Sequence, residues 1–437
     1  MMKAAGDSDT ERFYAIRPEC LKDVPKARFK PMSGKTLSAR RWHAAFSQEG
    51  YLDIAKVLSR IQRGGVHPSI KGEVWEFLLG CYDPKSTFDE RSQLRQLRRE
   101  QYEMWKAVCQ KMEPTIGSGR FITRPIITED GKPVEDPSAT SADSSGENTD
   151  SPPVRSSMFD DEVDLDERVI HWKLTLHQIG LDVVRTDRTL VFYENKNNDA
   201  KLWDILSIYA WVDKDIGYCQ GMNDLCSPMI ILLENEADAF WCFEHLMRRM
   251  RENFRCTTSS IGVQSQLTTL SSIIKVVDPK LHEHLENLDG GEYLFAFRML
   301  MVLFRREFSF VDSMYLWELM WAMEYNPNIF SLYQDCGTTT DPSVGMKGNN
   351  KHLKQYGKFG RKYAQTGSED PQSALSIFLI ASVLQNKNKR LMKEAKGLDD
   401  VVKILNEITG SLDAKKACNE ALKLHKQYLN KTKKPYK

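Results

Sequence analysis

Apolar residues recur at the spacing of amphipathic helices along most of the chain. Between Asp166 and Phe330 they stand three and four positions apart, which places them on one face of a helix with about 3.6 residues per turn. The clearest stripes are Leu202, Ile205, Leu206, Tyr209 and Val212; Phe240, Phe243, Leu246 and Met247; and Leu294, Phe297, Leu300, Met301 and Phe304. No run of alternating β-branched residues joined by hairpin turns stands out. The pattern therefore predicts an all-α fold.

Helical spacing extends to both sides of this region. Residues 53–62 predict one helix, and a break containing glycine and proline separates it from a second helix, for which Ser69 is the expected N-cap. A strongly charged stretch, residues 89–110, predicts a long helix on the surface. Near the C-terminus we expect helices over 374–385 and over 399–429, the latter interrupted by a glycine-containing turn.

Four further segments flank or interrupt the helices. Residues 113–164 are rich in proline, serine, threonine and acid, a composition that buries too little apolar surface to offset the entropy of ordering. Residues 334–371 are irregular and rich in glycine, threonine and lysine. We interpret both as disordered or irregular insertions within a single large domain, residues 38–430. A poorly ordered segment, residues 1–37, precedes this domain, and a basic tail, residues 431–437, follows it.

The composition narrows the class of protein. Of the 437 residues, 41% are hydrophobic, which is enough for a large core, and a net charge of +1 gives no overall attraction to nucleic acid or anionic lipid. Nine cysteines without a C-x-x-C pair indicate free thiols in a reducing compartment. The sequence shows no signal peptide and no apolar run long enough to span a bilayer. We therefore expect a cytoplasmic protein with at most peripheral membrane contact.

Signatures of nucleotide, metal and covalent chemistry are missing from the sequence. It contains no P-loop, no G-x-G-x-x-G turn that opens a helix after a strand, and no H-E-x-x-H. Cys242 and His245 stand three apart, where a core thiol beside a surface histidine is favoured over a metal site. We expect the chain to hold no cofactor of its own.

Two polar clusters stand out in apolar surroundings. In residues 179–186, Asp182 and Arg185 lie three apart in an otherwise apolar stretch. In residues 217–224, amide and aromatic side chains lie between two glycines, and two strongly apolar helices flank them. Glycine at such positions lets the backbone approach a ligand or a partner closely.

Residue types alone leave two interpretations of these clusters open. In the structural interpretation, Asp182 caps a helix or pairs with Arg185, while Gln220 and Asn223 satisfy backbone groups in a turn. In the functional interpretation, the same groups form a site that acts on a partner. Chemistry alone favours the structural interpretation.

Taken together, the two clusters resemble the paired arginine-finger and glutamine-finger motifs of TBC domains, which are found in GTPase-activating proteins of Rab-type small GTPases. The residues that carry the resemblance are Ile179, Asp182 and Arg185, followed by Tyr218, Gln220, Gly221 and Met222. Residues 63–75, 303–308 with 316–318, and 373–377 resemble other motifs of this family in the same order and spacing. The resemblance covers residues 55–425 and is closest to the Gyp7-like branch.

One position departs from the family pattern. Lys71 stands where the family usually has arginine, so that the cation is kept but the bidentate fork is lost. Because this opening motif is structural in the family, the departure puts little doubt on the implied catalytic residues.

The resemblance implies a GTPase-activating protein that supplies catalytic residues in trans. Arg185 would stabilise charge on the γ-phosphoryl group of GTP, and Gln220 would orient the attacking water. The implied supporting residues are Asp182, which would hold the arginine, with Ile179, Tyr218, Gly221, Met222 and Asn223. GTP and magnesium would arrive with the GTP-bound Rab partner.

The implied setting is vesicle trafficking, with no nucleic-acid partner and with peripheral attachment to endomembranes through the Rab. An alternative is a non-catalytic TBC domain that binds a Rab as an effector or scaffold. Degenerate members of the family lose the arginine or the glutamine, whereas this chain keeps both Arg185 and Gln220.

Overall fold

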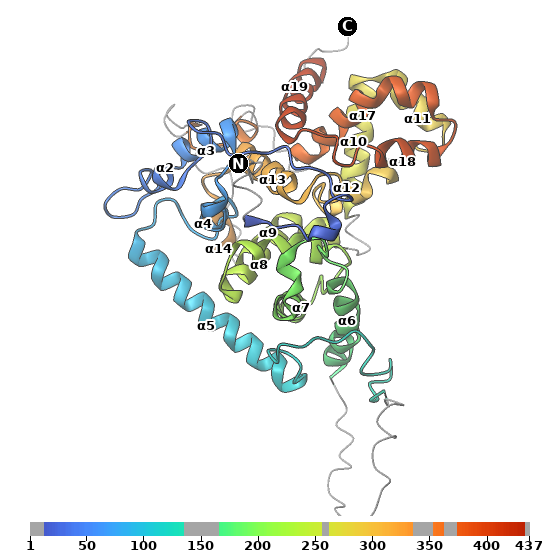
Figure 1. Ribbon diagram of the computed structural model, residues 1–437. Coiled ribbons are helices and arrows are strands. Elements are labelled where there is room, and N and C mark those ends of the chain that lie inside the picture. Colours follow the sequence, from blue (N-terminus) through green and yellow to red (C-terminus); the bar gives the residue numbers. More distant parts are fainter. Residues whose placement is uncertain (1–12, 135–165, 256–261, 335–352, 362–373, 433–437) are drawn as a thin grey trace, which may run out of the picture.

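The computed structural model of the chain describes residues 13–134, 166–255, 262–334, 353–361 and 374–432. These residues form α-helices, short 3-10 helices and isolated β-bridges, with no longer strand in the described ranges, so the expected all-α fold is confirmed. Figure 1 shows the arrangement. The α-helices are α2 (Ala39–His43), α3 (Ile54–Gly64), α4 (Lys71–Leu78), α5 (Phe88–Met112), α6 (Glu167–Val183), α7 (Lys196–Val212), α8 (Met222–Leu232), α9 (Glu236–Phe254), α10 (Val263–Val277), α11 (Pro279–Asn287), α12 (Phe297–Met301), α13 (Phe310–Glu324), α14 (Ile329–Gln334), α17 (Leu375–Glu394), α18 (Leu398–Asn406) and α19 (Ala414–Thr432). The 3-10 helices are η1 (Pro18–Cys20), η2 (Pro68–Ile70), η3 (Val191–Glu194) and η4 (Leu294–Ala296).

Helix α13 forms the centre of the fold. All its residues from Phe310 to Met323 are buried, and it packs against α3, α4, α17 and α19. On one side of it α6, α7, α8 and α9 pack on one another, and on the other side α10, α11, α17 and α19 do so (Figure 1). A helix that is apolar on every face must be surrounded by other elements, which explains this central position.

Two local predictions are wrong. Ser69 lies in η2 instead of capping α4, whose N-cap is Ile70 and whose end carries no side-chain cap. The stripe that begins at Leu294 does not form one helix, because α12 ends at Met301 and the next turn contains Leu303 and Phe304 with φ of 46° and 60°. This left-handed turn is uncommon for residues other than glycine, so apolar spacing could not reveal it.

A fully buried ion pair joins α4 to α13. The ammonium of Lys71 donates to Oε1 of Glu318, and both side chains are completely buried. Trp75 Nε1 donates to the same oxygen at 3.1 Å, and the N–H of Val66 donates to Oε2 at 3.1 Å. Burial lowers the pKa of Lys71, and the charge of Glu318 opposes that shift. The lysine that departs from the family pattern therefore holds the opening motif to the central helix.

Removal of this lysine should destabilise the fold strongly. Lys71→Met leaves the carboxylate of Glu318 buried without its cation, which we expect to cost about 3–5 kcal/mol of unfolding free energy. Urea denaturation followed by circular dichroism measures the loss. Lys56→Met, on the exposed side of α3, is the control and should change stability by less than about 0.5 kcal/mol. Equal midpoints for the two variants would contradict the expectation.

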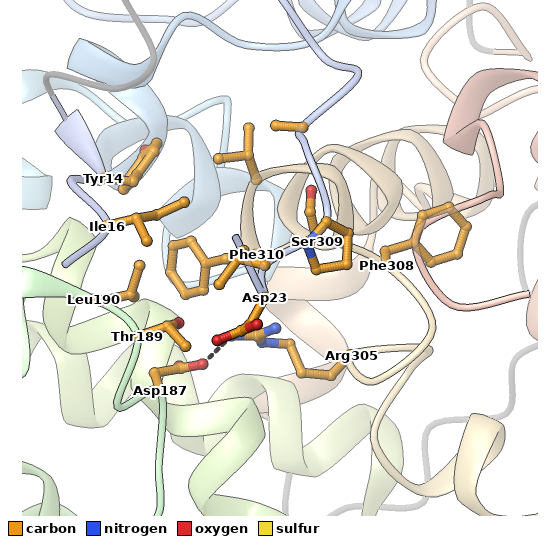
Figure 2. A pocket seen from close by; sticks show the side chains of 14 residues that line it. Tyr14, Ile16, Asp23, Asp187, Thr189, Leu190, Arg305, Phe308, Ser309 and Phe310 are labelled. Carbon is orange, nitrogen blue, oxygen red and sulfur yellow. Dashed lines mark hydrogen bonds and ion pairs between the residues drawn. The ribbon is translucent and has the colours of Figure 1, made fainter. Parts of the chain in front are cut away.

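The segment 1–37 is not poorly ordered where the structure describes it. Tyr14, Phe29 and Leu37 are buried, and the backbone N–H groups of Arg28 and Phe29 donate to the carboxylate of Asp312, from Phe29 at 2.7 Å. Figure 2 shows the side chain of Tyr14 in a pocket that Phe310 of α13 also lines. The prediction failed because a docked segment without helical spacing looks like a tail in sequence. Residues 1–12 lie outside the described ranges.

The insertion expected over 113–164 begins later than the composition indicates. Ile116 and Ile127 are buried, and the N–H of Gly117 donates to the carboxylate of Asp204 at 3.0 Å. The carbonyl of Ile122 packs so closely on α6 that a Cβ added to the glycine at position 180 would lie 1.7 Å from its oxygen. Residues 113–134 thus belong to the domain, and residues 135–165 lie outside the described part of the chain.

The second expected insertion also contains a docked part. Within residues 334–371, the structure describes Gln334 and residues 353–361. Phe359 is buried there, and the N–H of Gly357 donates to the carbonyl of Tyr325 at 2.9 Å. The rest of this insertion is not described.

Two deletions should separate the docked part of the first insertion from the remainder. Loss of residues 119–161 removes the buried Ile127 and the half-buried Ile122, and we expect the loss of Ile127 alone to cost about 1.5–3 kcal/mol. Loss of residues 136–161 alone should leave the melting temperature nearly unchanged, because that sequence has few apolar residues. Differential scanning calorimetry compares the two proteins. A large loss of stability in the shorter deletion would show that residues 136–161 also pack.

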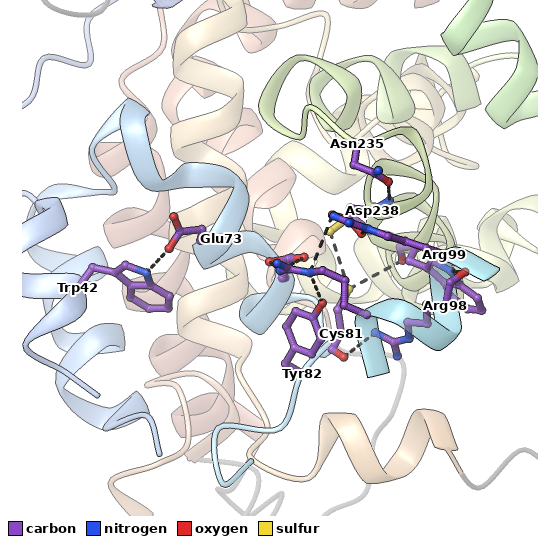
Figure 3. Close-up of polar contacts among 12 residues, drawn as sticks. Trp42, Glu73, Cys81, Tyr82, Arg98, Arg99, Asn235 and Asp238 are labelled. Carbon is purple, nitrogen blue, oxygen red and sulfur yellow. Dashed lines mark hydrogen bonds and ion pairs between the residues drawn. The ribbon is translucent and has the colours of Figure 1, made fainter. Parts of the chain in front are cut away.

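Helix α5 is the expected long surface helix, and it packs against α9 (Figure 1). Its arginines hold it there: Arg99 donates to Asp238 at 3.0 and 2.6 Å, and Arg95 donates to Glu76 at 3.0 and 2.8 Å. Burial raises the pKa of Glu76 to about 7, opposed by the charge of Arg95. Figure 3 shows Arg99 beside Asp238 of α9, which in turn packs against α8, the helix that begins at the site.

Candidate functional site

The C-terminal end of α6 presents an arginine to the surface. Asp182, in the last turn, has a side chain 7% exposed and forms an ion pair with Nη2 of Arg185, whose side chain is 54% exposed. The hydroxyl of Thr186 donates to the carbonyl of Asp182 at 2.7 Å and closes the turn. The local Asp–Arg pair that the structural interpretation foresaw is therefore present, and it leaves about half of the arginine side chain exposed.

The loop after Arg185 is anchored behind the surface. Asp187, with a φ of 44°, accepts from the hydroxyl of Ser227 at 2.6 Å and forms an ion pair with the buried Arg305 (Figure 2). The N-terminal segment crosses the next turn, where Ile16 forms an antiparallel bridge with Leu190. These contacts restrict the movement of the loop and so limit where the side chain of Arg185 can reach.

The second cluster forms the turn that leads into α8. Gly221 is the N-cap of α8 with a φ of 104°, and an added Cβ there would approach Val302 to 2.9 Å, so that only glycine fits. The amide oxygen of Asn223 accepts from the N–H of Gly221 at 3.1 Å. Asn223 thus satisfies the turn, as the structural interpretation expected, whereas the exposed side chain of Gln220 has no hydrogen bond to a described residue.

Tyr218 joins the two clusters. Its hydroxyl donates to Oδ2 of Asp182 at 2.6 Å, and the amide of Asn223 donates to the hydroxyl of Thr186 at 2.9 Å. Burial raises the pKa of Tyr218, and the hydrogen bond to Asp182 raises it further, so the phenol keeps its proton and remains a donor. The carboxylate of Asp182 is therefore shared between Tyr218 and Arg185, and it links the two motifs.

Arg185 and Gln220 line the same cleft, which has a volume of about 460 Å³. The residues that line it are Arg185, Gln220, Gly221, Asn223, Asp224, Phe297, Arg298, Met301, Val302 and Arg306. Ile179 and Met222 are fully buried in the core beneath it, and Met222 Sδ accepts from the N–H of Cys219 at 3.4 Å. The structure thus brings together both expected finger residues, while Ile179 and Met222 act only through packing.

A second wall of the cleft was missed by sequence reasoning. It comes from α12 and the turn after it, and it contributes two arginines, Arg298 and Arg306. The motif at 303–308 was noted in the sequence, but nothing in it assigned a role to Arg306. A left-handed turn at Leu303 and Phe304 precedes Arg306, whose side chain lines the same cleft as Arg185.

Metal chemistry finds no support in the described part of the chain. It contains no group of three or more His, Cys, Asp or Glu side chains that could hold a metal ion. Cys242 lies 3.8 Å from Cys81, and His245 is buried instead of lying on the surface as expected. Burial lowers the pKa of His245, and its ring contacts the carbonyl of Trp241.

In the described ranges no helix is both long and apolar enough to cross a bilayer.

The fold and the motifs agree with a known domain family. The sequence model of the Rab-GTPase-TBC domain matches residues 156–334, which include both finger motifs. The fold is similar to the crystal structure of the Ypt/Rab-GAP domain of Gyp1p, with a TM-score of 0.55, 17% sequence identity, and coverage of 90% of this chain and 98% of that one. Residues 156–334 therefore match a Rab-GTPase-TBC domain.

Several curated proteins are similar over most of the chain. Rab GTPase-activating protein 22 of Arabidopsis thaliana is 28% identical over 88% of this chain and 79% of its own length. TBC1 domain family member 17 of Homo sapiens is 28% identical over 90% of this chain, and GTPase-activating protein GYP7 of Saccharomyces cerevisiae is 25% identical over 86%. The matches span 46% and 43% of the lengths of these last two proteins.

Proposed function

We propose that the chain is a GTPase-activating protein for a Rab-family small GTPase in its GTP-bound state. The observation that carries the proposal is the cleft in which Arg185 and Gln220 both lie exposed, each on a loop fixed by buried contacts. The names of the similar proteins, among them Rab GTPase-activating protein 22 and GTPase-activating protein GYP7, support the same activity.

The arginine supplies positive charge where the reaction develops negative charge. During GTP hydrolysis charge spreads over the γ-phosphoryl oxygens, and an arginine provided in trans increases the rate by about 10³–10⁵-fold. Asp182 holds Arg185 by one nitrogen, and Tyr218 orients that carboxylate in turn. Such a side chain needs little reorganisation when the partner docks, which is the condition for electrostatic stabilisation of a transition state.

The glutamine supplies both a donor and an acceptor. The amide of Gln220 can accept from the attacking water and donate to a phosphate or backbone oxygen. Its side chain is not used by the protein's own turn, because Asn223 bonds the N–H of Gly221 there. The absence of a Cβ at Gly221 lets the turn that follows Gln220 pack closely against Val302. Magnesium and nucleotide are brought by the GTPase.

The alternative is a non-catalytic domain that binds a Rab as an effector or scaffold. Retention and exposure of both Arg185 and Gln220 favour catalysis over this alternative. Attachment to endomembranes, and with it a place in vesicle trafficking, would follow from binding to a lipid-anchored Rab. The near-neutral net charge supports attachment through the partner over direct capture by anionic lipid.

A panel of purified, GTP-loaded Rabs tests the proposal. Phosphate release is measured with and without the protein, and at least one Rab should hydrolyse GTP faster in its presence. A binding measurement on the same panel separates the alternatives, because an effector would bind a GTP-loaded Rab without accelerating its GTP hydrolysis. Binding without acceleration across the panel would replace the proposed activity with the scaffold role.

A further inference from the structure

Three arginine side chains, and not one, line the cleft that holds Gln220. The side chains of Arg185, Arg298 and Arg306 are 54%, 52% and 49% exposed. Each is paired with a carboxylate whose side chain is at most 8% exposed. The cations therefore face the cleft, while the charges that balance them lie behind it.

The buried acids fix the two additional guanidinium groups. Arg306 donates from Nε and Nη2 to one oxygen of Asp224, at 3.1 and 2.8 Å. Arg298 donates from the same two nitrogens to one oxygen of Glu307, at 3.1 and 2.9 Å, and Nη2 also donates to Asn406 at 3.1 Å. In neither arginine does Nη1 bond to a described residue. Both side chains have thus lost rotamer freedom in advance and keep donors for a partner.

We infer that Arg298 and Arg306 receive carboxylate side chains of the GTPase and set which GTPases the protein accepts. The inference rests on the proposed function and names the part of the partner that this wall of the cleft recognises. Arginine matches a carboxylate through paired N–H donors, and an Arg held in place binds with less loss of entropy.

The surroundings of the two arginines favour protein over nucleotide as the source of the oxyanion. Phe297, with 44% of its surface exposed, lines the same wall, and Leu294 on the preceding turn is 57% exposed. Arginine and aromatic residues together are typical of the centre of protein–protein interfaces. An apolar ring suits a protein surface and offers nothing to a phosphate, whose charge Arg185 already meets in the proposed mechanism.

The inferred contact gives a rule for specificity. A GTPase with an acidic residue facing Arg306 or Arg298 gains a charge-assisted hydrogen bond, whereas one with lysine or arginine there is repelled. Because such a contact is already formed in the docked ground state, it should affect the concentration of GTPase needed more than the rate of hydrolysis.

Steady-state hydrolysis at varied concentrations of an accepted GTP-loaded Rab tests the inference. Arg306→Gln and Arg298→Gln should each raise KM by about tenfold and leave kcat within about threefold. Arg390→Gln is the matched control, since that arginine is 37% exposed and paired with Glu394 and Glu407 but does not line the cleft. The control should leave KM and kcat unchanged.

A second variant guards against loss of structure. Arg306→Gln leaves Asp224 buried without its cation, so the double variant Arg306→Gln with Asp224→Asn restores an uncharged pair at that position. It should show the same rise in KM with a melting temperature close to that of the wild type. If KM returned to normal in the double variant, Arg306 would serve only to neutralise Asp224, and the inference would be overturned.

Substitutions on the partner locate the carboxylate. Each exposed acidic residue of the Rab is changed to alanine in turn. At least one of these Rab variants should show a higher KM with the wild-type protein, but no further rise with the Arg306→Gln or the Arg298→Gln protein. An unchanged KM in both arginine variants, or a loss confined to kcat, would overturn the inference while the proposed function stood. Failure of the wild type to accelerate any Rab would instead overturn the proposed function itself.

Discussion

Replacing Arg185 by lysine should lower stimulated GTP hydrolysis by about 10³-fold or more. Lysine keeps the charge beside Asp182 but offers a single ammonium group in place of a planar fork. A side chain that stabilises charge spread over several oxygens of the transition state cannot be replaced by a point donor at a different reach. The loss should appear in kcat and in kcat/KM alike, because the contact forms only in the transition state.

The fold should not change in this variant. The side chain of Arg185 is 54% exposed, and its ion pair with Asp182 spans three positions of one turn, an arrangement worth at most about 1 kcal/mol. Arg168→Lys, at the other end of α6, is the control and should stimulate GTP hydrolysis by the Rab as strongly as the wild type, because Arg168 contacts Trp211 and does not line the cleft. If Arg185→Lys stimulated hydrolysis to within tenfold of the wild type, Arg185 would have no catalytic role.

The second large effect concerns Gln220 and a Rab whose own switch glutamine has been changed to leucine. If this chain supplies the water-orienting amide, the wild-type protein should still accelerate hydrolysis by that Rab. Gln220→Ala should lower the stimulated rate of hydrolysis by about 10²–10³-fold with either form of the Rab, which is the usual effect of removing one group that stabilises a transition state. Single-turnover hydrolysis with saturating protein measures the chemical step without product release.

Gln220 is not needed to hold the turn in which it lies. Were Gln220 needed for its own turn, Gln220→Ala would lower stability more than rate, but the turn is closed by Asn223. The melting temperature of Gln220→Ala should therefore match that of Gln93→Ala, an exposed glutamine on α5 that serves as control. If the wild type gave no acceleration with the glutamine-less Rab, the protein would contribute at most its arginine.

Much of the site could be located from the sequence because its two motifs are local. Asp182 and Arg185 lie within one helical turn, and Gly221 and Asn223 lie within another, so short-range spacing is enough to propose them. The contact between Tyr218 and Asp182 joins the motifs and was not foreseen. The catalytic roles of Arg185 and Gln220 remain predictions that the two experiments above test.

The sequence alone determined the all-α class and most of the long helices, because a 3.6-residue period is a property of each segment by itself. It also indicated the similarity to TBC domains, through motifs that keep their order along the chain. Composition was less reliable at the edges of the domain. It classed residues 13–37 and 113–134 with the poorly ordered segments, although both dock on the helices.

Only the tertiary structure decided which distant residues meet. The pairing of Arg306 with Asp224, of Lys71 with Glu318, and of the N-terminal segment with Asp312 joins positions far apart in the chain. No periodic pattern records such pairs, because each is fixed by the packing of helices around α13 and by the cost of burying a charge without a partner. The second wall of the cleft therefore became visible only when the helices were assembled.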